Sequence, residues 1–469
     1  MKRRAIAALA LFAVSACSLE PRYARTELPV PPGWPVGDAY LRQSEAALAG
    51  YSYREVFADP RLLAVIERAL AQNQDLARAA ANIAAARAQY RIQRAELLPQ
   101  LDAGASYRRS GDDSGGGGGG GGGSGFSADL SVSGYEIDLF GRLRSLSGAA
   151  RDRYLASEAG ARAVRLTLIA DVADAWLAHA ADSSLLALAR DTAEAARESV
   201  RLTNRRLQGG IAPRSDLRQA EIVLRTAEAD IAAQTTAVAQ NRNALELLTG
   251  SPVDPAILPA AIEQAGANLR EVPAGIDSSI LLRRPDILEA EWQLRAANAD
   301  IGAARAALFP RITLTGLLGL AAPGLGALFS GGSFSWQAGA DASYPIFRAG
   351  AGKANVRLSE AQRDVALAQY RKAIQSAYAD VANALARRGT IQPQLLAVQG
   401  GRDAAADNLH LAGLRYRGGI TSYLEELTAR QALYSAERNL VEARRLRAAN
   451  LVALYRALGS DPTLVPPTR

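Results

Sequence analysis

Histidine and cysteine side chains carry much of the catalysis and metal binding in proteins, and this sequence offers very few of them. It has two histidines, His179 and His410, and a single cysteine, Cys17. No Ser-His-Asp or Cys-His arrangement can be assembled around them, so each histidine is interpreted as a packing or solvated residue. Residues 350–354 (GAGKA) look like a fragment of a phosphate-binding loop, but the upstream glycine and the Ser or Thr after the lysine are missing. We therefore expect no catalytic residue, no metal site and no cofactor.

The single cysteine directly follows a predicted N-terminal export signal. Residues 2–4 are Lys-Arg-Arg, and the apolar stretch that follows is too short to cross a bilayer as a helix. Residues 14–17 (VSAC) look like a bacterial lipobox, in which the signal peptide 1–16 is removed and Cys17 is acylated; the alternative is an ordinary signal peptide with a chance cysteine. An acylated cysteine is a membrane tether, not a span. Ser18 stands where an inner-membrane retention signal usually has Asp, which favours sorting to the outer membrane.

The rest of the chain is long enough for several ordinary domains, and its charges are spread along it. The formal net charge is +7 at pH 7, from 54 Lys and Arg against 47 Asp and Glu. The arginines lie beside Asp and Glu in helical stretches and do not gather with aromatic residues in one basic patch, so nucleic-acid binding is not favoured. After the signal peptide no segment has about 18 uninterrupted apolar residues, so we expect no transmembrane helix.

The sequence contains an internal duplication. Three short segments recur in the same order, and each lies 209 or 211 residues from its counterpart. The pairs are 95–101 (AELLPQL) with 306–312 (AALFPRI), 206–211 (RLQGGI) with 415–420 (RYRGGI), and 248–251 (LTGS) with 457–460 (ALGS). Each half reads as helix, strand, loop, strand, very long helix, tight turn and long helix.

These landmarks predict the domain organisation. We expect a signal peptide (1–16), a lipid-anchored N-terminal segment (17–58), a first structural repeat (59–251), a Pro- and Gly-bearing linker (252–278), a second structural repeat (279–462) and a C-terminal tail (463–469). The first helix of each half should end at the residue before a proline, Leu98 and Phe309, because that residue is pushed out of the α region.

After each of these prolines the period of the apolar residues changes from 3.6 to 2. In 334–344 every even-numbered residue is apolar and every odd-numbered residue is polar or Gly, and 126–133 alternates in the same way. Two further strands are expected directly after Pro99 and Pro310. The turns between paired strands are glycine-rich, with nine consecutive glycines at 115–123. A soluble sheet with one buried face would also alternate, but the loose turns and the very long helices that follow favour strands that cross a membrane.

Four strands cannot close a spanning barrel within one chain. Open strand edges in hydrocarbon leave backbone groups without hydrogen bonds, which is costly, and the smallest spanning barrels have about eight strands. Two copies of the chain would supply eight strands, too narrow for a water-filled lumen, whereas three copies would supply twelve. We therefore expect a trimer with a shared barrel.

A very long helix and a long return helix are expected in the first half. Residues 143–208 contain no proline and are rich in Ala, Arg, Leu and Glu, which predicts a rod of about 100 Å at ~1.5 Å per residue. The return helix should begin at Pro213, after the glycines at 209–210. Apolar residues recur along it at every seventh position, which is typical of a coiled coil. They are Leu217, Leu224, Ile231, Val238 and Leu245.

The second half repeats this pattern with one departure. Residues spaced by seven on its last helix are Leu427, Tyr434, Val441, Ala448 and Tyr455. A second apolar set on another face suits a helix that touches a neighbour on either side. Gly389 and Pro393 interrupt the long helix and have no counterpart in the first half, so a kink or break is expected there.

One segment of the second half carries a family signature. It comprises 282–291 (LRRPDILEAE) with Leu294, 296–299 (AANA), 301–304 (IGAA) and 309–310 (FP). It closely resembles the signature of the outer membrane factor family (TolC fold), and more narrowly its lipoprotein NodT/OprM-like branch. The resemblance covers 59–462. It implies a mainly α protein with a small transmembrane β part, in which long coiled-coil helices form a periplasmic α-barrel and four strands per chain contribute to a trimeric 12-stranded outer-membrane barrel.

The resemblance also implies positions for functional residues. Those that match adaptor-docking positions at the hairpin tips are Arg205, Gly209, Gly210, Arg415, Gly418 and Gly419. Those that match positions lining or latching the closed entrance are Asp216, Tyr416 and Glu425. The family often has two acidic residues one helical turn apart, whereas this chain has Thr428 one turn after Glu425, with Glu426 adjacent. A solvated charge at the helix end is therefore the alternative for Glu425. Carboxylate rings at a pore mouth favour cations.

The resemblance makes a passive outer-membrane channel the leading hypothesis. Such a channel is the exit duct of a tripartite efflux system and passes small molecules and drugs. They are delivered by an inner-membrane pump, expected to be proton-driven, and a periplasmic adaptor (membrane fusion) protein. Small-molecule efflux is favoured over protein secretion on branch resemblance alone. The channel would be lipid-anchored in the cell outer membrane, extend into the periplasm and have no enzymatic activity. The alternative is a structural or adaptor lipoprotein that bridges the envelope by coiled coil and forms no pore.

Overall fold

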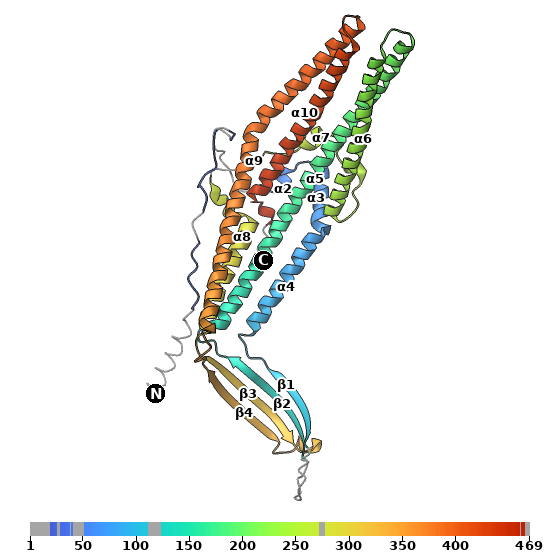
Figure 1. Ribbon diagram of the computed structural model, residues 1–469. Helices are drawn as coiled ribbons and strands as arrows, with labels where there is room; N and C mark the ends of the chain where they lie inside the picture. The colour runs from blue at the N-terminus through green and yellow to red at the C-terminus, as the bar shows by residue number, and fades with distance from the viewer. Residues whose placement is uncertain are drawn as a thin grey trace. The chain divides into compact units, whose positions relative to one another are not determined.

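The structure is a computed structural model that describes residues 19–25, 29–37, 39–40, 51–110, 123–271, 277–459 and 461–464 (Figure 1). The predicted signal peptide 1–16 and Cys17 lie outside the described residues. The chain forms two compact units. The strand unit comprises Met1–Thr26, Asn82–Glu158 and Glu289–Tyr370. The hairpin unit comprises Glu27–Ala81, Ala159–Leu288 and Arg371–Arg469.

The described chain is mainly helical with one small sheet, as predicted. The longer helices are α3 (Pro60–Gln72), α4 (Gln74–Ala95), α5 (Arg142–Gln208), α6 (Arg214–Thr249), α8 (Pro285–Ala306), α9 (Ala351–Arg417) and α10 (Tyr423–Leu458). The short ones are α2 (Tyr53–Val56), α7 (Ile262–Ala267), η1 (Pro255–Ile257), η2 (Ser278–Arg283), η3 (Leu325–Ala327) and η4 (Pro462–Leu464). The strands are β1 (Asp102–Ser110), β2 (Gly123–Glu136), β3 (Arg311–Ala322) and β4 (Phe334–Ser343).

The strand unit holds the four strands in one antiparallel sheet of order β1-β2-β3-β4 (Figure 1). Cross-strand side chains pack along it, as in Tyr107 and Phe126, whose ring centroids are 4.7 Å apart. A bulge in β2 lies between Val132 and Tyr135, where Gly134 has a φ of +65°. β1 and β4 are the edge strands, and every residue of β4 is exposed in the single chain.

The first helix of each half ends earlier than predicted. α4 ends at Ala95 and α8 at Ala306, three residues before Leu98 and Phe309. In both places the chain makes one tight turn: the N–H of Leu98 donates to the Ala95 carbonyl at 3.0 Å, and that of Phe309 to the Ala306 carbonyl at 3.1 Å. Each helix therefore ends in one tight turn before it reaches the residue that proline restricts.

The hairpin unit contains the tips of two helical hairpins, α5–α6 and α9–α10 (Figure 1). Pro213 is the N-cap of α6, so the helix begins one residue later than predicted, at Arg214. Of the kink or break expected at Gly389 and Pro393, the break is not found, because α9 runs unbroken for 67 residues with Pro393 inside it; the kink stays a prediction. Proline removes a single N–H from the helix, and buried Ile391 and Leu395 hold α9 against the rest of the unit on either side of it.

Gly389 has a separate explanation, which the sequence did not show. The residues Ala39 and Tyr40 pass directly against α9 at this position. A Cβ at residue 389 would overlap the carbonyl oxygen of Ala39 and would lie 2.8 Å from the carbonyl carbon of Tyr40. Glycine is needed there because two backbones approach closely, not because the helix ends.

The seven-residue pattern corresponds to buried positions in α10. Leu427, Val441, Ala448 and Tyr455 are all buried in the single chain. Tyr455 also packs edge-on against Phe57, with ring centroids 5.4 Å apart. None of the described helices combines the length and the apolarity that crossing a bilayer requires.

Candidate functional site

The two hairpin tips have the same backbone geometry. At the first tip the N–H groups of Gly210 and Ile211 donate to the carbonyls three and five residues earlier, at 3.0 and 2.9 Å. At the second tip Gly419 and Ile420 make the same bonds at the same distances. Gly210 and Gly419 each have a φ of +72°, a conformation that strains any side chain with a Cβ. Both tips are therefore Schellman motifs, which end α5 and α9 and allow the chain to reverse.

The structure places the six predicted docking residues at these tips. Gly209 and Gly418 precede the two αL glycines, and the Gly209 N–H donates to the Arg205 carbonyl at 3.0 Å. The Arg205 side chain is exposed. Arg415 has a different environment, because its Nη1 donates to Glu425 Oε1 at 2.7 Å. At the 209-residue spacing of the repeat, the counterpart of Arg415 is Arg206 and not Arg205.

Glu425, a predicted aperture residue, is thus part of an ion pair across the second tip. Arg415 and Glu425 belong to the same hairpin, and their side chains are both substantially exposed. An exposed pair of this kind stabilises by about 1 kcal/mol or less. Glu425 also lies in the first turn of α10, where the helix N-terminus favours a negative charge. Its charge is held in place but remains accessible.

Tyr416, the second predicted aperture residue, joins the two hairpins. Its hydroxyl accepts a hydrogen bond from the guanidinium of Arg206, whose Cζ lies 4.9 Å from the Tyr416 ring centroid. Its ring is 5.4 Å from that of Tyr423. Tyr423 is buried in a small apolar cluster with Ala196, Ala220, Val223 and Leu427. The sequence did not identify Arg206, although its position as the repeat counterpart of Arg415 could have pointed to it.

Asp216, the third predicted aperture residue, is not part of this contact. It lies in the first turn of α6, as Glu425 does in α10. The Ser215 hydroxyl donates to its carboxylate at 3.4 Å. Within the described part of the chain, no hydrogen bond or ion pair joins Asp216 to Tyr416 or Glu425.

A second polar contact between the hairpins lies farther along α6 and α10. The Tyr434 hydroxyl donates to Asp230 at 2.6 Å, and Arg438 approaches the same carboxylate at 3.5 Å. Burial raises the pKa of the Tyr434 hydroxyl, and the hydrogen bond and charge of Asp230 raise it further. Tyr434 belongs to the seven-residue pattern of the sequence. Asp230 has no place in that pattern, and the sequence did not identify it.

Residues 19–25 lie along α8 in the strand unit. Asn298 Nδ2 donates to the Pro21 carbonyl at 2.7 Å, and Arg25 Nη2 donates to Glu291 Oε2 at 2.5 Å. Burial alone would raise the pKa of the Glu291 carboxyl, but hydrogen bonds from Arg25 and Arg295 hold it below its usual value. Asn298 and Glu291 both belong to the family signature. Their role here is to hold the N-terminal segment.

The two histidines have structural or solvated positions. His179 is buried, burial lowers its pKa, and its Nδ1 lies 3.5 Å from the Ser183 hydroxyl. His410 is exposed on α9. Among the residues that the structure describes, no group of three or more His, Cys, Asp or Glu could hold a metal ion. The tips therefore combine contacts between the two hairpins with exposed polar side chains.

Comparison with known proteins places this geometry in a family. The sequence matches the family described as outer membrane efflux protein over residues 65–251 and 277–460. Two relatives from Pseudomonas putida are the antibiotic efflux pump outer membrane protein ArpC and the toluene efflux pump outer membrane protein TtgC. Each is 42% identical over 456 residues, which is 96% of this chain and 94% of the relative.

Solved structures share the fold. The open state of the Neisseria gonorrhoeae MtrE outer membrane channel is 36% identical and covers 95% of this chain and 98% of its own, with a TM-score of 0.85. The mainly α fold, the duplicated halves and these similarities together show that this chain belongs to the outer membrane efflux protein family and is an efflux channel of the outer membrane with the TolC fold.

Proposed function

We propose that this chain is the exit duct of a tripartite efflux system. Three copies form a channel, anchored by a lipid on Cys17, that passively passes molecules delivered by a periplasmic adaptor and an inner-membrane pump. The observation that carries the proposal is the incomplete sheet of the strand unit, in which β1 and β4 are both edge strands. Unpaired backbone groups in hydrocarbon are costly, and neighbouring copies can pair them. Three copies supply twelve strands, enough to enclose water.

Helix α4 supports the same proposal. It has no buried side chain in the single chain. Its repeat counterpart α8 buries Leu294, Ala303 and many others, and it is covered partly by α5 of the first half, as the contact of Gly302 with Ser145 shows. Ile92 of α4, the counterpart of Ala303, is exposed. By the symmetry of the repeat, α4 receives its cover from the second half of a neighbouring copy.

The repeat also specifies how two copies join. At the base of the β2–β3 ladder the Ile137 N–H donates to the Ile312 carbonyl at 2.9 Å. Ile346 lies 209 residues after Ile137, and Leu101 lies 211 residues before Ile312. Ile346 is 90% exposed and Leu101 is 68% exposed. We expect the same backbone pairing between Ile346 of one copy and Leu101 of the next, which places β4 beside β1 at each joint.

The hairpin tips are the proposed contact with the adaptor and the proposed closed entrance. Arg205, Gly209, Gly210, Arg415, Gly418 and Gly419 would form the docking surface. It is supported by the matching turns of the two tips, which present the same backbone shape twice per chain. Asp216, Tyr416 and Glu425 would line or latch the aperture. This role is supported by the bond of Tyr416 to Arg206 and by the accessible charge of Glu425.

The cargo is proposed from the relatives. ArpC is described as an antibiotic efflux protein and TtgC as a toluene efflux protein. From these relatives we infer that small apolar and amphipathic molecules are the cargo of this chain. A proton-driven pump is the proposed partner. The duct itself needs no catalytic residue, because the pump supplies the free energy of transport.

Conductance in a planar bilayer tests the proposal. Purified protein should insert as a trimer and give discrete channels, whose conductance the proposed closed entrance would keep small. Replacing Asp216 and Glu425 together by Ala should raise the conductance several-fold by loosening the closed end. Replacing Asp403 and Glu437, acidic residues away from the tips, should leave it unchanged.

A stable, water-soluble monomer without channel activity would favour the adaptor lipoprotein instead. Unchanged conductance of the tip variant would exclude the aperture role.

A further inference from the structure

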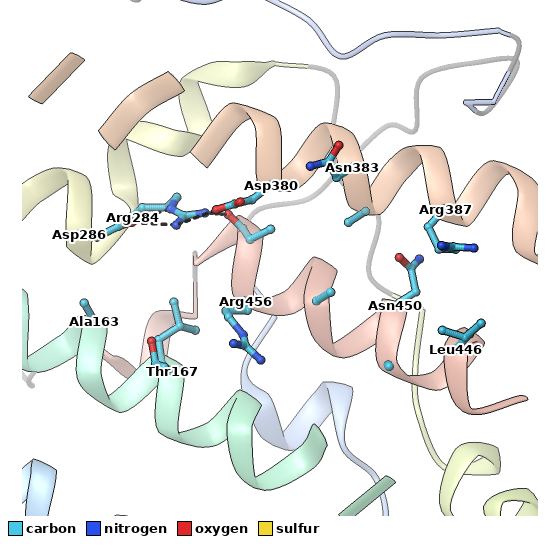
Figure 2. Close-up of a pocket in the computed structure, with 15 residues that line it drawn as sticks. Ala163, Thr167, Arg284, Asp286, Asp380, Asn383, Arg387, Leu446, Asn450 and Arg456 are labelled. Atoms are coloured by element: carbon cyan, nitrogen blue, oxygen red, sulfur yellow. Dashed lines mark hydrogen bonds and ion pairs between the residues drawn. The ribbon is translucent and has the colours of Figure 1, made fainter. Parts of the chain in front are cut away.

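The hairpin unit contains a cavity that neither the tips nor the sheet explain. Its volume is about 680 Å³, and it lies among α5, α9 and α10, beside the start of α8 (Figure 2). This is within the usual size range of pockets for small organic ligands, roughly 300–1,000 Å³. Arg284 and Asp286 of the family signature stand at one end of it.

The cavity opens on one defined face of α9. On the other face Tyr378 stacks on Trp34, with ring centroids 5.2 Å apart, and Gly389 contacts Ala39. Asp380 and Arg387, which line the cavity, are each two residues from these contacts, or about 200° around the helix. The N-terminal residues therefore cover the face of α9 that points away from the cavity. We assign the cavity side to the lumen of the proposed duct, because the lipid-anchored N-terminal residues would lie on the outer wall.

At the signature end the charges are already satisfied. Arg284 donates to the Ala457 carbonyl and pairs with Asp286 at 2.8 Å, with Asp380 at 3.8 Å. On the α5 side of the cavity, Arg456 pairs with two aspartates of that helix at 3.2 and 2.5 Å. Both charges are thus paired within the protein, and only the buried Nε of Arg456 has no hydrogen-bond partner among the described residues.

The opposite end differs, because its polar groups have no protein partner. Arg387 is exposed, and its guanidinium makes no hydrogen bond or ion pair among the described residues. Asn450 of α10 is only 7% exposed, lines the cavity and is likewise without a partner in the described chain. Arg387 and Asn450 lie together at this end of the cavity, and Asn383, one helical turn before Arg387 on α9, also lines it (Figure 2). The Asn450 amide is open to the cavity, so a ligand that enters can form hydrogen bonds with it.

The wall between the two ends is apolar. It is formed by Leu166, Ala384, Ala449 and Ala453, and Leu446 continues it beyond Asn450. A guanidinium with two amides at one end, followed by an apolar wall, fits a molecule with a carboxylate or sulfonate group and a small hydrophobic body.

We propose that this cavity is a binding site for small organic anions, with the acidic group held by Arg387, Asn383 and Asn450. The site deepens the proposed function by naming a cargo class that contacts the duct wall, and only its luminal position rests on that function. Binding itself is a property of the purified protein, whether or not the protein conducts. The full-length chain in detergent is therefore the right material for the test.

The test compares matched probes by ligand-observed NMR titration. 1-Naphthoate should bind at least about ten-fold more tightly than the neutral 1-naphthamide, because only the anion pairs with Arg387. Arg387→Gln should weaken naphthoate about ten-fold and leave naphthamide unchanged. Asn450→Ala should weaken naphthoate several-fold. Arg371→Gln, which removes another exposed arginine of α9 outside the cavity, is the control and should behave as the wild type.

Two results would overturn the inference. One is equal affinity for the anion and the neutral probe; the other is naphthoate binding that Arg387→Gln leaves intact. Channel recordings on the same preparations separate this inference from the proposed function. Normal channels without anion selectivity in binding would reject only the site. Selective binding in a protein that never conducts would support the site and reject the duct.

Discussion

Asn73 and Arg284, which lie 211 residues apart, make the same contact in the two halves of the chain. Asn73 Nδ2 donates to the carbonyl of Leu248 at 2.9 Å, near the end of α6. Arg284 Nη1 donates to the carbonyl of Ala457, 209 residues further along than Leu248, near the end of α10. In each half, a side chain just before the first long helix (α4 or α8) thus donates a hydrogen bond to the end of the last helix (α6 or α10). The two residues differ in type but have one role, because carbonyls at a helix end lack intrahelical partners.

Removing this cap should destabilise the hairpin unit. Arg284→Met keeps the length of the side chain but leaves the Ala457 carbonyl without a donor, so we expect a loss of about 1–3 kcal/mol in the free energy of unfolding. Asn73→Leu should act in the same direction. Arg283→Met, at the exposed neighbouring position, should stay within about 0.5 kcal/mol of the wild type. Thermal or denaturant unfolding measures the difference; equal losses at 283 and 284 would contradict the assigned cap.

The sequence predicted the periodic features of this molecule better than its single contacts. Alternation of apolar residues located β4 to within one residue, and the absence of proline located α5 to within one residue at each end. Both features depend on many residues, so no one position decides them. The cap by Asn73 depends on one side chain meeting a carbonyl far away in the sequence. No local sequence pattern predicts such a long-range hydrogen bond.

At the hairpin tips, too, the locally determined features were predicted and the long-range contact was not. The glycines of both turns were predicted because αL backbone geometry requires glycine locally. The partner of Tyr416 was not predicted, because Arg206 belongs to the other hairpin, and only the packing of one hairpin on the other brings them together. Pro393 led us to allow for a break that the structure does not have, for the opposite reason. Its local effect is real, but the buried residues on both sides of it keep α9 continuous.

Alanine at two glycines of α9 should have opposite effects. At Gly400 a Cβ would meet nothing within 4 Å, so Gly400→Ala should stabilise by about 1 kcal/mol through helix propensity. Gly389→Ala gains the same propensity but pushes against the carbonyl of Ala39, so it should destabilise or release the N-terminal segment. Thermal unfolding, together with limited proteolysis of residues 29–40, measures both effects. Stabilisation by both variants would show that the segment does not pack on α9.

The partly buried carboxyl of Asp174, which pairs with Arg456, should make the stability of the protein depend on pH. Burial raises the pKa of Asp174 to about 6, and the charge of Arg456 only partly offsets this. Between pH 7 and 5 the folded chain therefore takes up a proton at Asp174, whereas the unfolded chain, with a pKa near 3.8, does not. The folded state binds more protons, so this group contributes stability that is present at low pH and is lost as pH rises through 6.

Asp174→Asn removes this contribution to the pH dependence. Relative to the variant, the wild type should gain roughly 2 °C in Tm between pH 7 and pH 5. The gain is kept small because the side chain is 37% exposed and solvent screens its charge. Asp403→Asn, an exposed carboxylate of α9, should keep the wild-type profile. Parallel profiles for the wild type and Asp174→Asn would place the titration elsewhere.

Cysteines at positions 101 and 346 should link neighbouring copies. The pairing of Ile137 with Ile312 inside the chain places paired residues of antiparallel strands about 4.5–5.5 Å apart at Cα, a separation that a disulfide can bridge. If the repeat is continued around a trimer, Leu101 and Ile346 face each other at every joint between copies. Under mild oxidation the double variant Leu101→Cys, Ile346→Cys should therefore give covalent dimers and trimers on a denaturing gel. Each single variant should remain a monomer, and any linkage through native Cys17 would appear there as well.

Leu314→Cys paired with Ile346→Cys is the matched control, because Leu314 lies in β3, which is already paired on both edges. Cross-linking in the control, or none in the double variant, would show that β4 of one copy does not meet β1 of the next in this register.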